Sequence, residues 1–354
     1  MSYQISESQL RRWMDALIDE GCRLIAPVAT RGPLRFEPIE SAAEAVFDQG
    51  RTRWSPKEYL LPRQETLFEY STNQEAQVEI HEPPLEPDQS VLFGIPPCDA
   101  AGLARLVAVF EGAFEDPYVL GRQRAMTIVS WTCAKALPEC FCTAVGGSPG
   151  GELGSDVLIT DLGEAQEARY LVQPLNDKGR RLIEDEVEAW EVASTKTEER
   201  ADRLKREVEA SMTREPFSGA SSDDLQERFS DDVWSELASA CVGCKICTTV
   251  CPSCSCFEVY DKGDARCGSR SRCWDGCTQA LFTRHATGHN PRPTQAARLR
   301  QRVLHKFSYY PQQFGASMCV GCGRCSLLCP AGLDVHQTVM RVLEQAARQQ
   351  EANP

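Results

Sequence analysis

Two cysteine runs with the same spacing carry the clearest chemistry of this 354-residue chain. The first run, CVGCKICTTVCP, covers residues 241–252, and the second, CVGCGRCSLLCP, covers residues 319–330. Each has the form CxxCxxCxxxCP, which binds cubane iron-sulfur clusters in bacterial ferredoxins. Thiolates are soft ligands suited to such clusters, and three of them in one tight loop can hold three irons of a cubane. Two copies of the run therefore predict two 4Fe-4S clusters.

The fourth iron of each cubane needs a thiolate from outside the three-cysteine loop. In two-cluster ferredoxins the fourth cysteine of each run binds the other cluster, so we expect the two runs to exchange their last cysteines. The first cluster is predicted to bind Cys241, Cys244, Cys247 and Cys329. The second cluster is predicted to bind Cys319, Cys322, Cys325 and Cys251. These eight thiols are the predicted metal ligands, and no catalytic residue is predicted.

Zinc and disulfides are the weaker interpretations of these cysteines. Structural zinc sites usually pair CxxC elements without a third cysteine at the next step. The chain begins MSYQISESQLRRWMDAL, which lacks an apolar signal region, and no window approaches the roughly 18 apolar residues that a membrane span requires. We therefore expect a cytoplasmic protein with reduced thiols and no membrane span.

The composition indicates which partners to expect. The chain has 38 Lys and Arg residues against 51 Asp and Glu residues, a net charge of −13. A negative surface repels the phosphates of nucleic acids, so no nucleic-acid partner is expected, and it fits docking on other proteins. Hydrophobic residues make up 42% of the chain, and its length allows two domains of about 150 residues each.

The pattern of apolar residues in the front half, residues 1–220, predicts an α/β domain. Apolar residues at helical spacing indicate a helix over residues 5–21, and two short apolar segments after it indicate strands. The segment VLFGIPPCDAAGLARLVAVF, residues 91–110, is typical of a buried strand, a turn and a helix, and a second apolar strand is expected over residues 126–131. The stretch SGASSDD, residues 218–224, marks the expected end of this domain.

In the front half, each of the two expected buried strands, residues 91–95 and 126–131, is followed closely by a cysteine. Cys98 lies in the turn after the first strand, Cys133 follows the second, and the segment PECFC adds Cys140 and Cys142. Neighbouring strands bring the loops that follow them together, and four is the number of thiolates that a cluster needs. We therefore predict a third iron-sulfur cluster at these four cysteines. The alternative is that they are structural cysteines beside a docking surface.

The back half, residues 221–354, has a helical pattern. Helical periodicity precedes the first cysteine run and follows the second, so helices are expected to flank both cluster loops. Cys251 and Cys319 are separated by 67 residues, far more than the spacer of small bacterial ferredoxins. The predicted fold class is α+β: an N-terminal α/β domain in residues 1–220, followed by a helical two-cluster ferredoxin-like domain with a long insertion in residues 221–354.

Motifs along nearly the whole chain carry a resemblance to a known family. The chain resembles the 4Fe-4S dicluster family that includes the beta subunit of cytoplasmic sulfhydrogenases and the corresponding iron-sulfur subunit of anaerobic sulfite reductase. The resemblance implies an electron-transfer subunit within an oxidoreductase complex rather than its catalytic centre. The segments that carry it are GIPPCDAAGL, EDPYVLGR, CFC, WSELASACVGCKICTTVCPSCSCF, RCWDGC, TGHNPR, RVLHKFSYYP and CVGCGRCSLLCP.

The two branches of this family imply different partners. In the hydrogenase branch they are a nickel-iron large subunit, a small iron-sulfur subunit and a flavin subunit that binds NAD(P). In the sulfite reductase branch they are a flavin subunit and a siroheme subunit. We expect the beta subunit of a cytoplasmic nickel-iron hydrogenase or sulfhydrogenase. The alternatives are the corresponding subunit of anaerobic sulfite reductase, or a subunit that reduces sulfur or polysulfide at a cluster or at an exposed thiol.

Two further groups lie in the long insertion. Cys254, Cys256 and Cys277 match the family pattern and are interpreted as packed thiols near the clusters, since a free cysteine behaves as a small buried hydrophobe. The basic segment ARLRQRVLHK, residues 297–306, is interpreted as a solvated helix face. Two alternatives stay open for it: a patch that docks an acidic partner, or a group that stabilises the negative clusters electrostatically.

Overall fold

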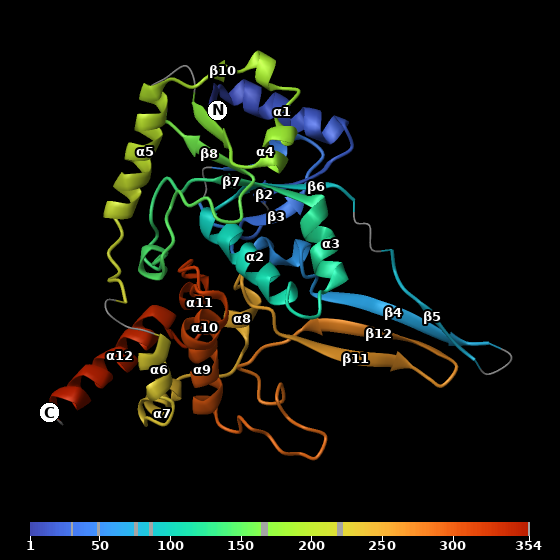
Figure 1. Ribbon diagram of the computed structural model, residues 1–354, viewed down its shortest axis with the longest axis vertical. Helices are drawn as coiled ribbons and strands as arrows, with labels where there is room; N and C mark the ends of the chain where they lie inside the picture. The colour runs from blue at the N-terminus through green and yellow to red at the C-terminus, as the bar shows by residue number, and fades with distance from the viewer. Residues whose placement is uncertain are drawn as a thin grey trace.

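The computed structural model describes residues 1–29, 31–47, 50–73, 77–84, 88–163, 169–217 and 222–352. Two β-sheets and a set of helices build this part of the chain (Figure 1). None of the described helices is both long enough and apolar enough to span a membrane.

The larger sheet has eight strands in the order β10-β1-β9-β8-β7-β6-β2-β3. Its neighbours β8, β7, β6 and β2 run parallel to one another, and the outer pairs are antiparallel. The strand β6 reads SVLFGI and is buried along most of its length, as a parallel strand covered on both faces should be. The strands are β1 (Tyr3–Ile5), β2 (Arg23–Val28), β3 (Arg35–Pro38), β6 (Ser90–Ile95), β7 (Met126–Trp131), β8 (Val157–Asp161), β9 (Tyr170–Pro174) and β10 (Glu191–Val192).

Helices pack on both faces of this sheet. Successive strand side chains point to opposite faces, so Phe93 joins the core under α1 while Leu92 joins the core under α2 and α3. On the α1 side, Trp13 meets Phe93 edge to face with ring centroids 5.3 Å apart. The elements around the sheet are α1 (Glu7–Asp19), α2 (Pro97–Phe110), α3 (Pro117–Ala125), α4 (Asp177–Leu182) and α5 (Thr195–Ala210), with short helical turns η1 (Ala42–Glu44), η2 (Pro56–Tyr59), η3 (Thr143–Val145) and η4 (Val187–Ala189).

The elements expected in the front half are confirmed. The first helix begins after Ser6, whose side chain and that of Gln9 form a reciprocal capping box, and the chain turns just beyond the helix at Gly21 with φ of +84°. The segment 91–110 folds as β6 followed by α2, and residues 126–131 form β7. Cys98 and Cys133 thus follow neighbouring parallel strands, at the same edge of the sheet.

A second, antiparallel sheet has the strand order β11-β12-β4-β5 and extends away from the rest of the molecule (Figure 1). It combines strands from both sides of the predicted domain boundary at residue 220, which itself stays a prediction. The buried guanidinium of Arg272 bonds to Glu65 of the neighbouring strand at 2.6 Å. It also bonds to Asp116, the N-cap of α3, and this bond fastens the sheet to the body. The strands are β4 (Gln64–Thr72), β5 (Val78–His81), β11 (Phe257–Gly263) and β12 (Cys267–Trp274).

Apart from β11 and β12, the regular elements of the described C-terminal part are helices, and the α+β fold class is confirmed. Its core packs Trp234 and Leu237 against Val303, Phe307 and residues of the last helix. Phe141 and Phe217 from the front half complete this core. The helices are α6 (Ser222–Glu227), α7 (Val233–Ala238), α8 (Ile246–Thr249), α9 (Gln295–Leu304), the π-helical segment η5 (His305–Tyr309), α10 (Tyr310–Phe314), α11 (Arg324–Leu327) and α12 (Val335–Ala352).

Candidate iron-sulfur centres

The two cysteine loops have the same backbone shape. In the first loop Gly243 and Lys245 adopt φ of 65° and 57°, and in the second Gly321 and Gly323, at the matching positions, adopt 64° and 71°. Lys245 is the single non-glycine residue with positive φ in the described part of the chain. A left-handed lysine costs about 1–2 kcal/mol, and such strain persists where the surrounding structure enforces it, commonly at functional sites. The shared conformation presents the three thiols of each loop in the same way.

A first cavity is enclosed by cysteines of both runs. Its lining includes Ala331, Leu333 and Val335 from the chain after the second run. Apart from the thiols, the polar side chains in its lining are those of Lys245, Arg302 and two threonines. The thiols are those of Cys241, Cys244, Cys247, Cys325 and Cys329. The structure thus brings the predicted ligands of the first cluster around one space, including Cys329 from the other run.

A second cavity gathers the other predicted set. Three cysteines of the second run line it together with one cysteine of the first run, and Cys325 forms part of the wall of both cavities. The thiols are those of Cys251, Cys319, Cys322 and Cys325. Each cavity thus combines three cysteines of one run with the last cysteine of the other run, as the spacing predicted. Ligation by these eight thiols stays a prediction.

The two cavities differ in their distance from solvent. In the first loop Cys244 is exposed and the neighbouring Val242 is 70% exposed. In the second loop Cys319 and Cys322 are buried, and Arg105 donates to the Cys319 carbonyl at 2.6 Å. The first loop therefore offers the more accessible route for an electron.

The four cysteines of the front half also lie together. Cys133 interacts electrostatically with Cys140 and Cys142, and Cys98 interacts with Cys133 and with Cys322 of the second cavity. Burial, followed by these neighbours, raises the pKa of Cys133 to about 12. The structure brings this predicted third group together beside the second cavity, and binding of a cluster there stays a prediction.

The segment around Cys140 and Cys142 packs directly on the second cysteine loop. The Phe141 amide donates to the Gly321 carbonyl at 2.8 Å, and a Cβ on Gly321 would collide with the Phe141 oxygen. Arg51 donates to the Cys322 carbonyl, and its Nη1 lies 3.6 Å from the Cys140 sulfur. Across the described residues, no three His, Cys, Asp or Glu side chains converge closely enough to hold one metal ion.

Comparison with known proteins identifies the family. The family model of the 4Fe-4S dicluster domain matches residues 240–333, which contain all eight predicted ligands. Sulfhydrogenase 2 subunit beta of Pyrococcus furiosus is 31% identical over 323 residues, which is 88% of this chain and 90% of the relative. The chain belongs to the sulfhydrogenase beta subunit family. No solved structure matches it.

Membership of the sulfhydrogenase beta subunit family confirms the resemblance found in the sequence. The dicluster domain implies two 4Fe-4S clusters as cofactors, so this chain is an iron-sulfur electron-transfer subunit. The donor set fits, because each cavity is lined by at least four thiols, the number that a cubane requires. When bound, each cluster supplies a one-electron redox centre, and the surrounding side chains determine how easily it accepts the electron.

Three buried basic side chains lie near the cysteines of this chain. Lys57, Arg302 and Lys306 are 2%, 4% and 3% exposed, and none forms an ion pair with a carboxylate among the described residues. Burial lowers the pKa of Lys57, which favours the neutral form of its amine. Burying an unpaired cation costs several kcal/mol, so Arg302 and Lys306 need a negative partner. Thiolate-ligated clusters are negatively charged and would supply that partner. The charge of the site therefore also fits the clusters.

The contacts of these cations point at the thiols. Lys306 Nζ lies 3.4 Å from the Cys251 sulfur and 3.1 Å from the Ser253 hydroxyl. Burial acts to lower the pKa of Lys306, but the negative charge of Cys251 and Cys254 raises it overall. Lys306 therefore stays protonated and keeps its positive charge at the wall of the second cavity.

Arg302 lies between the two cavities and lines both of them. Its Nη2 donates to the Cys247 carbonyl at 3.0 Å, and its Nη1 lies 3.7 Å from the Cys254 sulfur. A single positive charge thus faces both predicted clusters. It favours the reduced, more negative form of each.

The interpretation of residues 297–306 as a solvated helix face is wrong. Arg298, Arg302 and Lys306 are buried, and Arg302 and Lys306 line the cysteine cavities rather than facing water. Arg298 bonds to Gln295 and to the Arg292 carbonyl. The alternative of electrostatic stabilisation fits the structure. The signal in the sequence was the spacing of Arg298, Arg302 and Lys306 at i, i+4 and i+8, which aligns them on one face of a helix.

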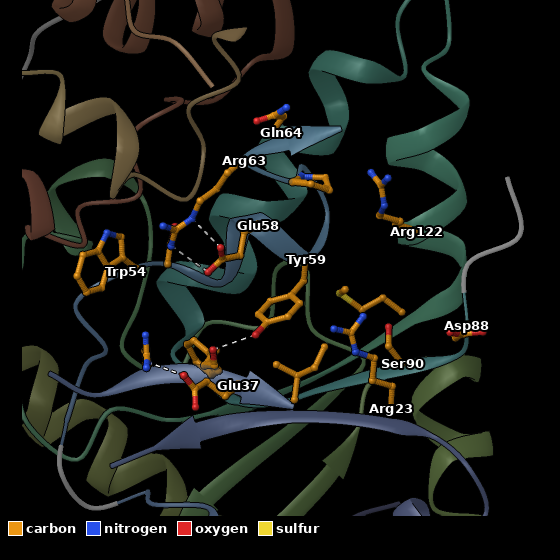
Figure 2. A pocket seen from close by; sticks show the side chains of 16 residues that line it. Arg23, Glu37, Trp54, Glu58, Tyr59, Arg63, Gln64, Asp88, Ser90 and Arg122 are labelled. Atoms are coloured by element: carbon orange, nitrogen blue, oxygen red, sulfur yellow. Dashed lines mark hydrogen bonds and ion pairs between the residues drawn. The ribbon is translucent and has the colours of Figure 1, made fainter. Parts of the chain in front are cut away.

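A larger cavity lies apart from the cysteines. It has a volume of about 880 Å³ and lies beside β2 and β3, with Arg23, Arg35, Arg63 and Arg122 in its wall (Figure 2). Arg35 pairs with Glu37 at 2.5 Å and Arg63 with Glu58 at 2.7 Å, so much of its charge is already neutralised. None of the described residues that line it is a cysteine, so this cavity lies outside the iron-sulfur centres.

Proposed function

We propose that this chain is the iron-sulfur beta subunit of a cytoplasmic nickel-iron hydrogenase or sulfhydrogenase complex. In that complex it relays electrons between a flavin subunit that binds NAD(P) and the other redox subunits. The observation that carries the proposal is the pair of thiol-lined cavities that share Cys325. Two redox centres that share one wall are close enough to exchange single electrons.

The residues of this chain serve electron transfer and make or break no bond of a substrate. The eight cysteines hold the two redox centres, and Arg302 and Lys306 offset the negative charge that arrives with each electron. The buried second loop excludes water, which strengthens every electrostatic interaction there. Electrons enter or leave at the first loop, where Val242 and Cys244 reach solvent.

A third cluster at Cys98, Cys133, Cys140 and Cys142 extends this path. Its position next to Cys322 supports a linear order of first cavity, second cavity and third group. The partners would then dock at opposite ends of the path, one near Val242 and one near the segment 133–142.

The proposal is tested by purifying the tagged chain from its native organism without oxygen. The associated proteins are identified by mass spectrometry, and nickel and iron are counted in the same sample. A nickel-containing hydrogenase subunit and a flavin subunit that binds NAD(P) are the expected partners. Recovery of a siroheme subunit without nickel would instead assign the chain to a sulfite reductase. A tagged Cys241→Ser variant is purified in parallel, because it removes a predicted ligand of the first cluster and should lower the iron count by about four.

The same preparation tests the polysulfide alternative. The isolated chain with its clusters in place is supplied with polysulfide and a chemical reductant, and sulfide is measured. An electron-transfer subunit gives no more sulfide than the reductant alone. Sulfide production that is lost in the Cys241→Ser variant would make this chain itself a reductase.

A further inference from the structure

The long insertion between the two cysteine runs brings two glutamine side chains to the first cysteine loop. Gln279 Nε2 donates to the Gly243 carbonyl in the middle of that loop. Gln295, the first residue of α9, donates through its Nε2 to the Cys241 sulfur at 3.1 Å. The insertion thus contacts the loop once at its backbone and once at the sulfur of a predicted cluster ligand.

The hydrogen bond from Gln295 is aimed at the sulfur itself. The Cys241 sulfur stands for the thiolate that binds the first cluster. A second hydrogen bond reaches this ligand set from the backbone, because the Leu333 amide donates to the Cys329 sulfur at 3.3 Å. Gln295 is half-buried, so its amide is partly shielded from water that would compete for the same bond.

Arg298 decides which way the Gln295 amide faces. Its Nε and Nη2 both donate to Gln295 Oε1, at 3.2 and 2.8 Å. A guanidinium carries donors and no acceptor, so the amide oxygen must face Arg298. The amide nitrogen is left to face the sulfur. The bond to Cys241 therefore follows from the position of Arg298, one turn further along α9.

Arg298 is itself held in place by the segment that precedes α9. It is 8% exposed, and its Nη1 donates to the Arg292 and Pro293 carbonyls, each at 3.0 Å. All of these acceptors are neutral oxygens. The positive charge therefore polarises the Gln295 amide, and a polarised amide is the stronger donor to sulfur. The segment TGHNPR, residues 287–292, thus acquires a role in supporting the first cluster.

A donor at a ligand sulfur acts on the reduction potential. Hydrogen bonds to the sulfurs are one of the factors that set the potential of an iron-sulfur cluster. The ligand sulfur becomes more negative when the cluster accepts an electron, so the bond is stronger in the reduced state. Such a bond therefore raises the potential.

We propose that Gln295 and Arg298 raise the reduction potential of the first cluster through the hydrogen bond to Cys241. Gln295 is the donor, and Arg298 is a positioning residue that acts through it. The inference rests on the electron-transfer role proposed above, with Cys241 as a ligand. Because electrons enter or leave at the first loop, this pair sets the driving force for transfer between this chain and the partner docked there.

The test uses the whole protein with its clusters, prepared without oxygen and titrated by electron paramagnetic resonance (EPR) at a series of potentials. The signal of the first cluster is the one that Cys241→Ser lacks. Gln295→Met keeps the length of the side chain and removes the donor, so it should shift the first potential to more negative values and leave the second unchanged. Gln337→Met, an exposed substitution in the first turn of α12, is the matched control and should shift neither potential.

The positioning role of Arg298 is tested by a double-variant cycle. Arg298→Met should shift the first potential in the same direction, because the amide is no longer held toward the sulfur. The double variant with Gln295→Met should shift it no further than Gln295→Met alone. A shift equal to the sum of the two single shifts would show that Arg298 does not act through Gln295, and would overturn its role.

The iron content of each variant is measured beside its potential. Gln295→Glu is the second variant at this position, since a carboxylate keeps the contact with Arg298 but cannot donate to the sulfur, and it should also lower the first potential. A wild-type potential in either variant, with its iron retained, overturns the inference. Loss of about four irons in both variants would assign Gln295 a structural role and overturn it as well. Failure of the proposed function is seen separately, in the subunits that accompany the wild-type protein and in its own cluster signals.

Discussion

Arg324 and Asp99 form a fully buried ion pair that joins the second cysteine loop to the N-terminal sheet domain. Both terminal nitrogens of the Arg324 guanidinium, Nη1 and Nη2, donate to carboxylate oxygens of Asp99 at 2.6 Å, and the side chains are 1% and 0% exposed. Arg324 lies between Cys322 and Cys325, while Asp99 follows Cys98. The pair thus fixes the second cavity and the third group relative to each other.

Asp99→Asn should destabilise the protein strongly, because it leaves the Arg324 charge buried without its counter-ion. We expect the free energy of unfolding to fall by about 3–5 kcal/mol, measured by chemical denaturation with the clusters in place. Arg180→Ala, which breaks an exposed ion pair with Asp177, is the matched control and should change little. Equal stability of the two variants would contradict this role.

The crossed ligand sets predict which cluster each cysteine supports. Cys329→Ser should lose the first cluster and Cys251→Ser the second, each with a loss of about four irons per chain. Iron analysis and EPR spectroscopy check this prediction. The spectrum of Cys329→Ser should match that of Cys241→Ser, and the spectrum of Cys251→Ser should match that of Cys319→Ser. The opposite matching would mean that each run binds its own cluster.

Arg302→Gln should shift the reduction potentials of both clusters to more negative values. The substitution removes a positive charge that faces both cavities, so the more negative reduced state of each cluster loses stabilisation. Redox titration followed by EPR measures both potentials in one sample. Arg302→Lys keeps the charge and is the control. A shift confined to one cluster would show that Arg302 is not shared.

The third cluster is tested by counting iron. With three clusters, anaerobically purified protein should contain about twelve irons per chain, and with two it should contain about eight. Cys133→Ser and Cys140→Ser should then each lower the count by about four and leave the signals of the first two clusters unchanged. Cys22→Ser, a half-buried cysteine in the main core, is the control. A wild-type count near eight would refute the third cluster.

The sequence alone determined the cofactor class and its eight candidate ligands. The spacing of cysteines within a short loop sets the distances between their thiols through local covalent geometry, so the motif can be interpreted without knowledge of the fold. Much of the secondary structure was also predictable. The apolar segment 91–110 could only be buried, and it folds as β6 and α2 as expected.

Only the tertiary structure decided which side chains surround those cysteines. Arg324 and Asp99 are 225 residues apart, and Lys57 and Cys254 are 197 apart, so their contacts depend on how the two parts of the chain pack. The basic segment 297–306 could face water or a buried centre, since helical periodicity reveals that a polar face exists but not what it faces. Because α9 and η5 pack over the cysteine loops, Arg302 and Lys306 are buried and place their positive charges at the cavity that the thiols line.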